Sequence, residues 1–319
     1  MSLPSLRMAS SRFCSTKSSN LPLYLSGVGL AGLGGYLYVT RFSGSAMANA
    51  PAVAVQEKSP LDPNEFVEFK LKKVEPYNHN TSKFIFELPD NQASLLPVAS
   101  CVIVKSSDPE ALKGSNGKPV IRPYTPISPS DAPGELAFIV KKYPTGLASV
   151  HIHDLKPGDS LSIKGPIPKF PYKENEFEEV ALIGGGSGIT PLYQILTHAL
   201  PKKTNKTKFT LIFANVTEAD ILLREEFDEL KKSYPDKFNV VYVLDKGTKD
   251  WKGETGFVTK EIIKKYVPSP DLHEKVKVFI CGPPAQVSSV AGKKDGFKQG
   301  ELGGALKELG YAEDQVYKF

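Results

Sequence analysis

The feature that most restricts the fold of this chain is a glycine cluster, GGGSG at residues 184–188, between two apolar segments. The run VALI precedes it, and PLYQILTHAL, whose apolar residues have helical spacing, follows it. A buried strand, a glycine turn and a helix in this order are typical of a dinucleotide-binding unit, because glycines let the backbone approach a pyrophosphate. Pro191 suits the first helical position, where no backbone N–H is missed. A tight turn without a ligand is the alternative.

Around this cluster, continuous apolar runs alternate with helical stretches. KFTLIFANV, FNVVYVLD and KVKVFI are strand-like, and ILLREEFDELKKSYP, VTKEIIKKYV and GALKELGY have helical character. Continuous apolar runs between helices are typical of parallel strands covered on both faces. Residues 173–319 are therefore predicted to form a doubly wound α/β domain.

The preceding part of the chain has a different pattern. Between residues 64 and 172, short runs such as SKFIFELP, SCVIVKSS and ELAFIVKKY are bounded by Pro, Gly, Asn or Asp, and helical patterns are nearly absent. About six such strands in so short a segment predict a small antiparallel β-barrel or sandwich.

The first 63 residues have the composition of a targeting segment, a transmembrane helix and a linker. Residues 1–20 are rich in Ser and carry only positive charge, as in a mitochondrial targeting segment. Residues 21–40 are apolar and long enough, at about 1.5 Å per residue, to cross a bilayer as one transmembrane helix. A cleaved signal is the alternative, and residues 41–63 are predicted to be a flexible linker.

The charge distribution argues against a nucleic-acid-binding protein. The net charge is +5, and Arg7, Arg12, Lys17 and Arg41 all precede the first acid, Glu57. The remaining chain is therefore nearly neutral and predicts no clustered basic face.

The cysteines and histidines predict no metal site. Cys14, Cys101 and Cys281 are too widely spaced for a disulfide framework or a four-thiolate site, so free thiols are expected. His151 and His153 are two residues apart, but no Cys or carboxylate pair accompanies them.

Two further motifs follow predicted strands of the α/β domain. Cys281, Gly282 and Pro283 end KVKVFI, so they should lie at the same sheet edge as the glycine cluster, although a buried structural thiol is the alternative for the cysteine. Asp245 ends FNVVYVLD, where an acid can accept hydrogen bonds from a ribose. An acid there repels a 2′-phosphate and favours NADH over NADPH.

The segment RPYTPIS at residues 122–128 is the candidate site of the first domain. Strand alternation would place Arg122 and Tyr124 on one face, as a cation for phosphate and a ring to stack on a heterocycle. An ordinary exposed edge strand is the alternative.

Together these motifs carry a resemblance. RPYTPIS, GGGSGITPLYQIL, FANVTEADILLREEFDEL, CGPP and VYKF, in this order, resemble the NADH-cytochrome b5 reductase family of the ferredoxin reductase-like flavoenzymes. The resemblance covers residues 64–319, and with the amino-terminal segments the whole chain is similar to the fungal mitochondrial form.

The resemblance implies an activity, partners and a location. The chain would accept hydride from NADH on FAD and pass electrons one at a time to cytochrome b5 or a similar one-electron haem protein. It would be held in the mitochondrial outer membrane by residues 21–40 in a single pass, with a processed intermembrane-space form as a further product. A related NAD(P)H flavin reductase that serves a ferredoxin, a quinone or another haem protein, and a non-catalytic nucleotide-binding tether, stay open.

The resemblance also implies site residues. In the family, the Arg of RPYT contacts the FAD pyrophosphate, the Tyr packs on the flavin and the Thr bonds near flavin N5. The implied FAD-binding residues are Arg122, Pro123, Tyr124, Thr125, Val140, Tyr143, Gly146, Ala148 and Ser149. The implied NADH-binding residues are Gly184, Gly185, Gly186, Ser187, Gly188, Thr190, Pro191, Asp245, Cys281, Gly282, Pro283 and Phe319. The implied catalytic residues are Thr125, Lys141 and Cys281.

Two departures from the family pattern concern FAD. The phosphate-cradling turn reads TGLAS at residues 145–149, where the family usually has Gly-Gly-Lys-Met followed by Ser or Thr. GPIPKF lacks the second glycine of the usual adenine-side GPxGxF. The first departure removes a cation and predicts weaker FAD binding.

Overall fold

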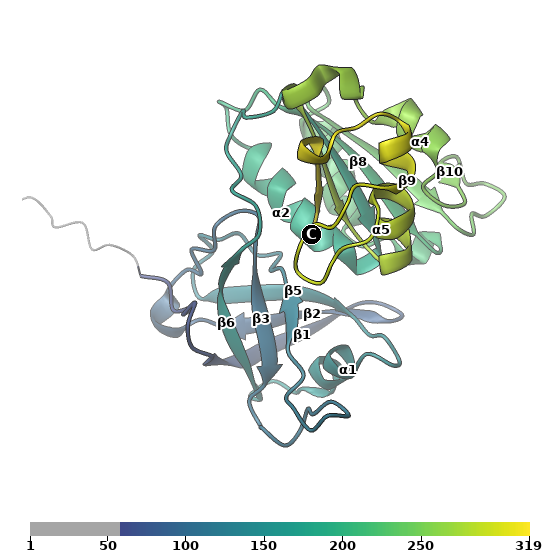
Figure 1. Ribbon diagram of the computed structural model, residues 1–319. Coiled ribbons are helices and arrows are strands. Elements are labelled where there is room, and N and C mark those ends of the chain that lie inside the picture. The colour runs from purple at the N-terminus through teal and green to yellow at the C-terminus, as the bar shows by residue number, and fades with distance from the viewer. Residues whose placement is uncertain (1–57) are drawn as a thin grey trace, which may run out of the picture. The chain divides into compact units, whose positions relative to one another are not determined.

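The structure, a computed structural model, describes residues 58–319 (Figure 1). The predicted targeting segment and transmembrane helix, and most of the predicted linker, lie outside the described residues. Between residues 58 and 319, no helix has both the length and the apolar character needed to cross a bilayer.

The amino-terminal domain is built on a six-stranded antiparallel sheet with the order β4-β3-β6-β1-β2-β5. The Ile127 N–H, just beyond β4, donates to the Ala137 carbonyl in β5 at 2.8 Å, which links the two outermost strands of this order. The predicted antiparallel architecture of this domain is therefore confirmed. The strands are β1 (Val67–Asn78), β2 (Thr81–Glu87), β3 (Ser100–Ser106), β4 (Arg122–Tyr124), β5 (Glu135–Lys141) and β6 (Ser160–Pro168).

Alternating side chains explain how these strands enclose a core. On β5, Leu136, Phe138 and Val140 point into one apolar cluster, and Phe138 pairs in register with Phe84 of β2. Residues two apart on a strand share a face, so these three side chains face one core, and Ala137 and Ile139 between them are buried on the opposite face. One α-helix of the described part, α1 (Leu147–Asp154), follows β5, and the short 3-10 turn η1 (Pro89–Asn91) follows β2.

The carboxy-terminal domain has a six-stranded parallel sheet with the order β10-β9-β8-β7-β11-β12. The strands are β7 (Glu179–Gly185), β8 (Lys208–Asn215), β9 (Phe238–Leu244), β10 (Glu254–Thr255), β11 (Val276–Cys281) and β12 (Val316–Lys318). The α-helices are α2 (Ile189–Ala199), α3 (Arg224–Ser233), α4 (Lys260–Tyr266), α5 (Pro284–Ala291) and α6 (Gly304–Glu308). The 3-10 turns are η2 (Gly186–Gly188), η3 (Glu218–Asp220), η4 (Pro270–Lys275) and η5 (Glu313–Gln315).

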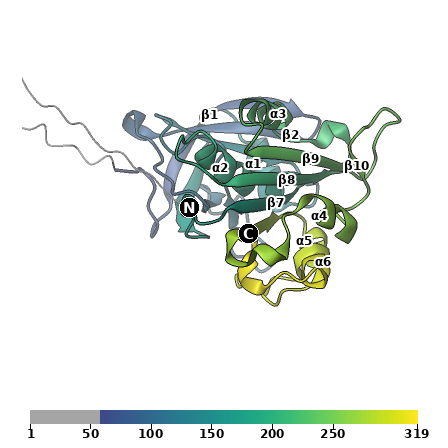
Figure 2. The same cartoon turned by 90° about the horizontal axis from the view of Figure 1, so that it is seen from above.

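Helices cover both faces of this sheet, as predicted. Leu192 of α2 and Phe227 of α3 belong to the apolar cluster on one face, and Ile263 of α4 and Val290 of α5 belong to the cluster on the other. Figure 2 shows α2 and α3 on one side of the strands and α4 to α6 on the opposite side. The doubly wound architecture is therefore confirmed.

The strand order reverses between β7 and β11. From β7 the chain adds β8 and β9 on one side, and then returns to place β11 on the other side of β7. Ligands of open α/β sheets bind at the carboxyl ends of the strands where the order reverses. The residues that follow β7 and β11 therefore form the candidate ligand-binding edge of this sheet.

The two domains share part of their core. Ile139 of β5 is buried in the same apolar cluster as Leu192 and Phe227 of the carboxy-terminal domain, and Ile127 packs against that cluster.

Candidate functional site

The glycine cluster and the Cys281 segment lie against each other at the reversal of strand order. Gly184 of β7 pairs in register with Cys281 of β11. A Cβ atom on Gly188 would lie 2.4 Å from the Cys281 carbonyl oxygen, and one on Gly185 would lie 2.8 Å from Cδ of Pro283. Glycine is therefore needed at both positions for this close approach. The structure brings together the two segments that were expected to share a sheet edge.

The start of α2 differs from the expectation for Pro191. The turn η2 covers Gly186–Gly188 and α2 begins at Ile189, so Pro191 is the third helical residue and the prediction that it is the first is wrong. The position is still compatible with proline, because the first four N–H groups of a helix have no partner within the helix. Thr190 and Pro191 are buried, and Ser187 is half-buried on the turn.

The carboxyl end of β11 forms an apolar corner with the last residue of the chain. The Phe319 N–H donates to the Ile280 carbonyl at 2.9 Å, and the Phe319 ring lies 5.8 Å from that of Phe279. Burial raises the pKa of the Cys281 thiol to about 12. At neutral pH Cys281 is therefore a protonated thiol and is not a nucleophile. Gly282 is half-buried and Pro283 is exposed.

Asp245 lies two strands away from the glycine turn. It directly follows β9, is exposed, and its N–H donates to the Asn215 carbonyl at the end of β8 at 3.0 Å. The carboxylate therefore stands in solvent at the carboxyl edge of the sheet, where salt screens its interactions.

In the amino-terminal domain, β4 presents the predicted cation and ring. Arg122 is exposed, and its guanidinium donates to its own neighbour, the Ile121 carbonyl, at 2.8 Å. Tyr124 is half-buried with its ring edge-on to Phe138 at 6.2 Å, and burial raises its pKa to about 12. Pro123 between them is exposed, and the half-buried Thr125 that follows has no side-chain hydrogen bond to any residue in 58–319.

The predicted phosphate-cradling turn leads into α1. Gly146 is the residue before the helix, and the Ser149 hydroxyl donates to the Gly146 carbonyl at 2.9 Å and accepts from the Tyr143 N–H at 3.1 Å. The Ser149 side chain is therefore used within the turn, and the donors available to a phosphate are the free N–H groups of the first helical turn. Ala148 packs with Val120, beside the segment that leads into β4.

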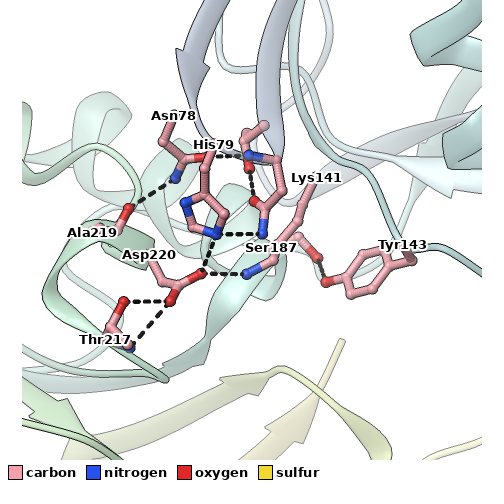
Figure 3. Close-up of polar contacts among 10 residues, drawn as sticks. Asn78, His79, Lys141, Tyr143, Ser187, Thr217, Ala219 and Asp220 are labelled. Atoms are coloured by element: carbon pink, nitrogen blue, oxygen red, sulfur yellow. Dashed lines mark hydrogen bonds and ion pairs between the residues drawn. The ribbon is translucent and has the colours of Figure 1, made fainter.

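The end of β5 reaches the carboxy-terminal domain (Figure 3). Val140 is buried, and its carbonyl lies 2.8 Å from Nε2 of His153. Lys141 Nζ donates to Oδ1 of Asp220 at 2.9 Å, and the Tyr143 hydroxyl lies 2.8 Å from that of Ser187 on the glycine turn. The residues implied for FAD and those implied for NADH therefore meet at this strand end.

Sequence reasoning gave no role to Asp220, Asn78 or His79, which also lie at this junction (Figure 3). The Asn78 side chain donates to the Ala219 carbonyl at 3.0 Å, and Nε2 of His79 lies 3.6 Å from Oδ1 of Asp220. The available signal was the Thr-x-x-Asp spacing of residues 217–220, which is a helix-capping pattern. It predicts a local turn but not a contact with another domain.

The donors present at the site suit a flavin and a dinucleotide. Arg122 has an exposed guanidinium, the first turn of α1 has free N–H groups, and the Thr125 hydroxyl has no partner among the described side chains. The glycine turn after β7 offers backbone N–H groups beside the start of α2. In the described part of the chain, no three or more His, Cys, Asp or Glu side chains gather as a metal site would require.

Comparison with known protein families matches both domains. Residues 68–172 match the Oxidoreductase FAD-binding domain, and residues 182–291 match the Oxidoreductase NAD-binding domain. The two matched segments agree with the division of the chain seen in the structure.

Related proteins and solved structures agree with these matches. The chain is 48% identical to "NADH-cytochrome b5 reductase 2" of Mycosarcoma maydis over 96% of its own length and 90% of that protein. It is 46% identical to the protein of that name in Phaeosphaeria nodorum, over 98% of its length and 95% of the relative. The solved cytochrome b5 reductase domain of Ulva prolifera nitrate reductase is 26% identical, with a TM-score of 0.70 over 82% of this chain and all (100%) of that domain.

Proposed function

This chain belongs to the NADH-cytochrome b5 reductase family, and on that premise we propose how its residues divide the work. The protein is an oxidoreductase that binds FAD and NADH, accepts hydride from NADH on FAD and delivers electrons to cytochrome b5. The observation that carries the assignment of residues is the contact between the end of β5 and the glycine turn after β7, where Tyr143 meets Ser187.

FAD is assigned to the surface formed by β4, the end of β5 and the start of α1. Arg122 and the N–H groups of the first turn of α1 supply positive potential for the pyrophosphate. Tyr124 supplies a half-buried ring for the flavin, and Thr125 supplies a free hydroxyl for hydrogen bonding near N5. When bound, the flavin supplies the step that neither partner can make alone, because it takes two electrons at once and releases them singly.

NADH is assigned to the carboxyl ends of β7 and β11. The glycine turn donates N–H groups to the pyrophosphate, and Cys281 and Phe319 give the nicotinamide end an apolar wall that excludes water. The protonated Cys281 thiol carries no charge that would repel the dinucleotide. Asp245, two strands away, is placed for the ribose of the adenosine end.

The amino-terminal sequence supports a proposal for the location of the protein in the cell. We propose that residues 1–20 direct the chain to mitochondria and that residues 21–40 hold it in the outer membrane in a single pass. The Ser-rich basic segment and the uncharged apolar segment support this proposal. Retention in the membrane pellet after alkaline carbonate extraction of mitochondria is expected, and full release would contradict the anchor.

The activity is tested by steady-state NADH oxidation with two competing acceptors. The purified protein should be yellow, reduce ferricyanide with NADH, and reduce cytochrome b5 with the same cofactor. Reduction of ferricyanide but not of cytochrome b5 would indicate another acceptor. A colourless protein that binds no FAD would contradict the assignment itself.

A further inference from the structure

We propose that Asp220 is a positioning residue for hydride transfer, which holds Lys141 and thereby fixes the end of β5 in register with the NADH domain. This inference rests on the proposed function, because it concerns the geometry of that reaction. It is carried by contacts that cross between the two domains at the place where FAD and NADH are assigned (Figure 3).

The Asp220 carboxylate is oriented by hydrogen bonds within the carboxy-terminal domain. Its Oδ2 accepts from the Thr217 hydroxyl at 2.7 Å and from the Thr217 N–H at 3.1 Å. Burial by itself raises the pKa of Asp220, but the hydrogen bonds from Thr217 and Lys141 outweigh it and the net shift is downward. Asp220 is therefore an ionised carboxylate in a fixed orientation, with Oδ1 directed at the amino-terminal domain.

Lys141 approaches Oδ1 from the end of β5. The pair is more buried than any other ion pair among residues 58–319, with 16% of the Lys141 side chain and 8% of the Asp220 side chain exposed. Exposed pairs contribute little, whereas a buried charge left without its partner is strongly unfavourable. An ammonium group has three donors, and Asp220 takes one, so a lysine held here still has donors for a bound dinucleotide.

Neighbouring contacts show that the end of β1 also packs on the segment around Asp220. Asn78 donates to the Ala219 carbonyl at 3.0 Å, and the Leu223 N–H donates to the Tyr77 hydroxyl at 2.7 Å. Leu223 is buried and has φ 56°, a left-handed conformation that is unfavourable for a bulky residue. An unfavourable backbone conformation persists only where packing and hydrogen bonds around it hold it in place. We therefore take this junction to be rigid.

Lys141 lies between residues assigned to FAD, so a shift of Lys141 would also shift the flavin site. Lys141 directly follows Val140 and stands two residues before Tyr143, and both of those are assigned to FAD. Hydride transfer needs the donor carbon and the flavin nitrogen in near-attack geometry, and a displacement of about 1 Å can cost about a hundredfold in rate. A loosened β5 end would therefore slow transfer without preventing NADH from binding.

The test uses the FAD-loaded full chain and rapid mixing with NADH. Asp220→Asn keeps the shape and removes the charge, and it should slow the limiting rate of flavin reduction by about tenfold to hundredfold. The dissociation constant of NADH should change much less than that rate. The primary isotope effect with deuterated NADH should rise, and the long-wavelength charge-transfer absorbance of the reduced flavin with NAD⁺ should weaken. A purely structural role would leave the isotope effect and the absorbance unchanged.

A double-mutant cycle tests whether Asp220 acts through Lys141. Lys141→Met combined with Asp220→Asn should be no slower than Lys141→Met alone, because both changes remove the same interaction. The proposal would be overturned if the fold-decreases in flavin-reduction rate of the two single variants multiplied in the double variant. It would also be overturned if Asp220→Asn kept the parent rate. The matched control is Glu308→Gln, which removes a carboxylate paired with Lys260 inside the NADH domain at 3.0 Å and should keep the parent rate.

Two further measurements distinguish a failure of this proposal from loss of FAD in the variant and from a failure of the proposed function. If Asp220→Asn does not retain FAD, Thr217→Val decides, because it removes the hydroxyl hydrogen bond to Oδ2 of Asp220 while keeping the side-chain shape and the backbone N–H bond. It should slow flavin reduction several-fold, and an unchanged rate would overturn the proposal. A parent chain that holds FAD but is not reduced by NADH would instead contradict the proposed function.

Discussion

A Cβ atom placed on Gly188 would lie 2.4 Å from the carbonyl oxygen of Cys281, so the glycine turn after β7 and the end of β11 are in direct backbone contact. Cβ atoms essentially never approach another atom this closely. The atom in contact belongs to the backbone, so it cannot move aside as the end of a flexible side chain could. This contact, at the site proposed for NADH, therefore depends on the absence of a side chain at residue 188.

Gly188→Ala should force these two segments apart and abolish most NADH-dependent flavin reduction while the FAD content stays high. The matched control is Gly186→Ala, because Gly186 has φ +51° but nothing within 4 Å of the position that an added methyl group would occupy. That substitution carries only the cost of a left-handed alanine, about 1–2 kcal/mol. Flavin reduction by NADH and the thermal midpoint of both variants check this. Equal effects would show that strain, and not close approach, fixes the turn.

Arg122→Ala should weaken FAD binding by about tenfold to hundredfold, because a charge-assisted hydrogen bond to phosphate contributes about 1.5–3 kcal/mol. Hydride transfer in the fraction that keeps FAD should change little. The absorbance of bound flavin per mole of protein measures occupancy. Arg122→Lys is the control, since it keeps the charge and loses the two-pronged geometry, and it should lie between the parent and Ala. Full occupancy with slow reduction would place Arg122 at the nicotinamide instead.

Asp245 should make the enzyme prefer NADH over NADPH, because its carboxylate repels a 2′-phosphate. The side chain is exposed, so we expect about tenfold discrimination from this residue, falling as salt is added. Asp245→Thr should reduce the ratio of kcat/KM for the two cofactors by that factor. A parent enzyme with equal preference would contradict the assignment of this acid.

Cys281 should resist alkylation over the ordinary pH range. Burial raises its pKa to about 12, so the thiol stays protonated up to strongly alkaline pH and the reactive thiolate is scarce below that. At pH 8 its thiolate population should therefore be far below that of a thiol with the ordinary pKa of 9.0. The rate of iodoacetamide labelling at Cys281, distinguished from Cys14 and Cys101 by peptide mapping, is compared between the folded enzyme and the urea-unfolded chain. Fast labelling of Cys281 in the folded enzyme at pH 8 would show that its thiolate is accessible.

Removal of residues 1–41 should leave a yellow protein with full ferricyanide activity, since the residues assigned to FAD and NADH all lie at Arg122 or beyond. Transfer to cytochrome b5 in liposomes should fall, because an anchor confines both partners to one surface and raises their effective concentration. The comparison is made with anchored and truncated protein in the same vesicles. Loss of ferricyanide activity would mean that the amino-terminal segment supports the catalytic body.

The sequence predicted those features that depend on local spacing. The continuous apolar runs of β5 and β7 each identify a strand that is buried on both faces, and the glycine cluster identifies the turn after β7. It did not predict the role of Asp220, since the Thr217–Asp220 spacing describes a local cap. That Lys141 lies on the other side of the cap follows only from how the two domains pack. The start of α2 was missed by two residues because η2 leads into the helix ahead of Pro191.

The burial of Ile139 among Leu192 and Phe227 has a consequence for how the protein melts. Since this strand of the FAD domain completes the core of its neighbour, neither domain can unfold without exposing apolar surface of the other. Residues 58–319 should therefore give a single cooperative calorimetric transition. FAD, bound to one domain, then raises the melting temperature of both by mass action. The supply of flavin in the cell would thereby govern the lifetime of the whole catalytic body as well as its activity.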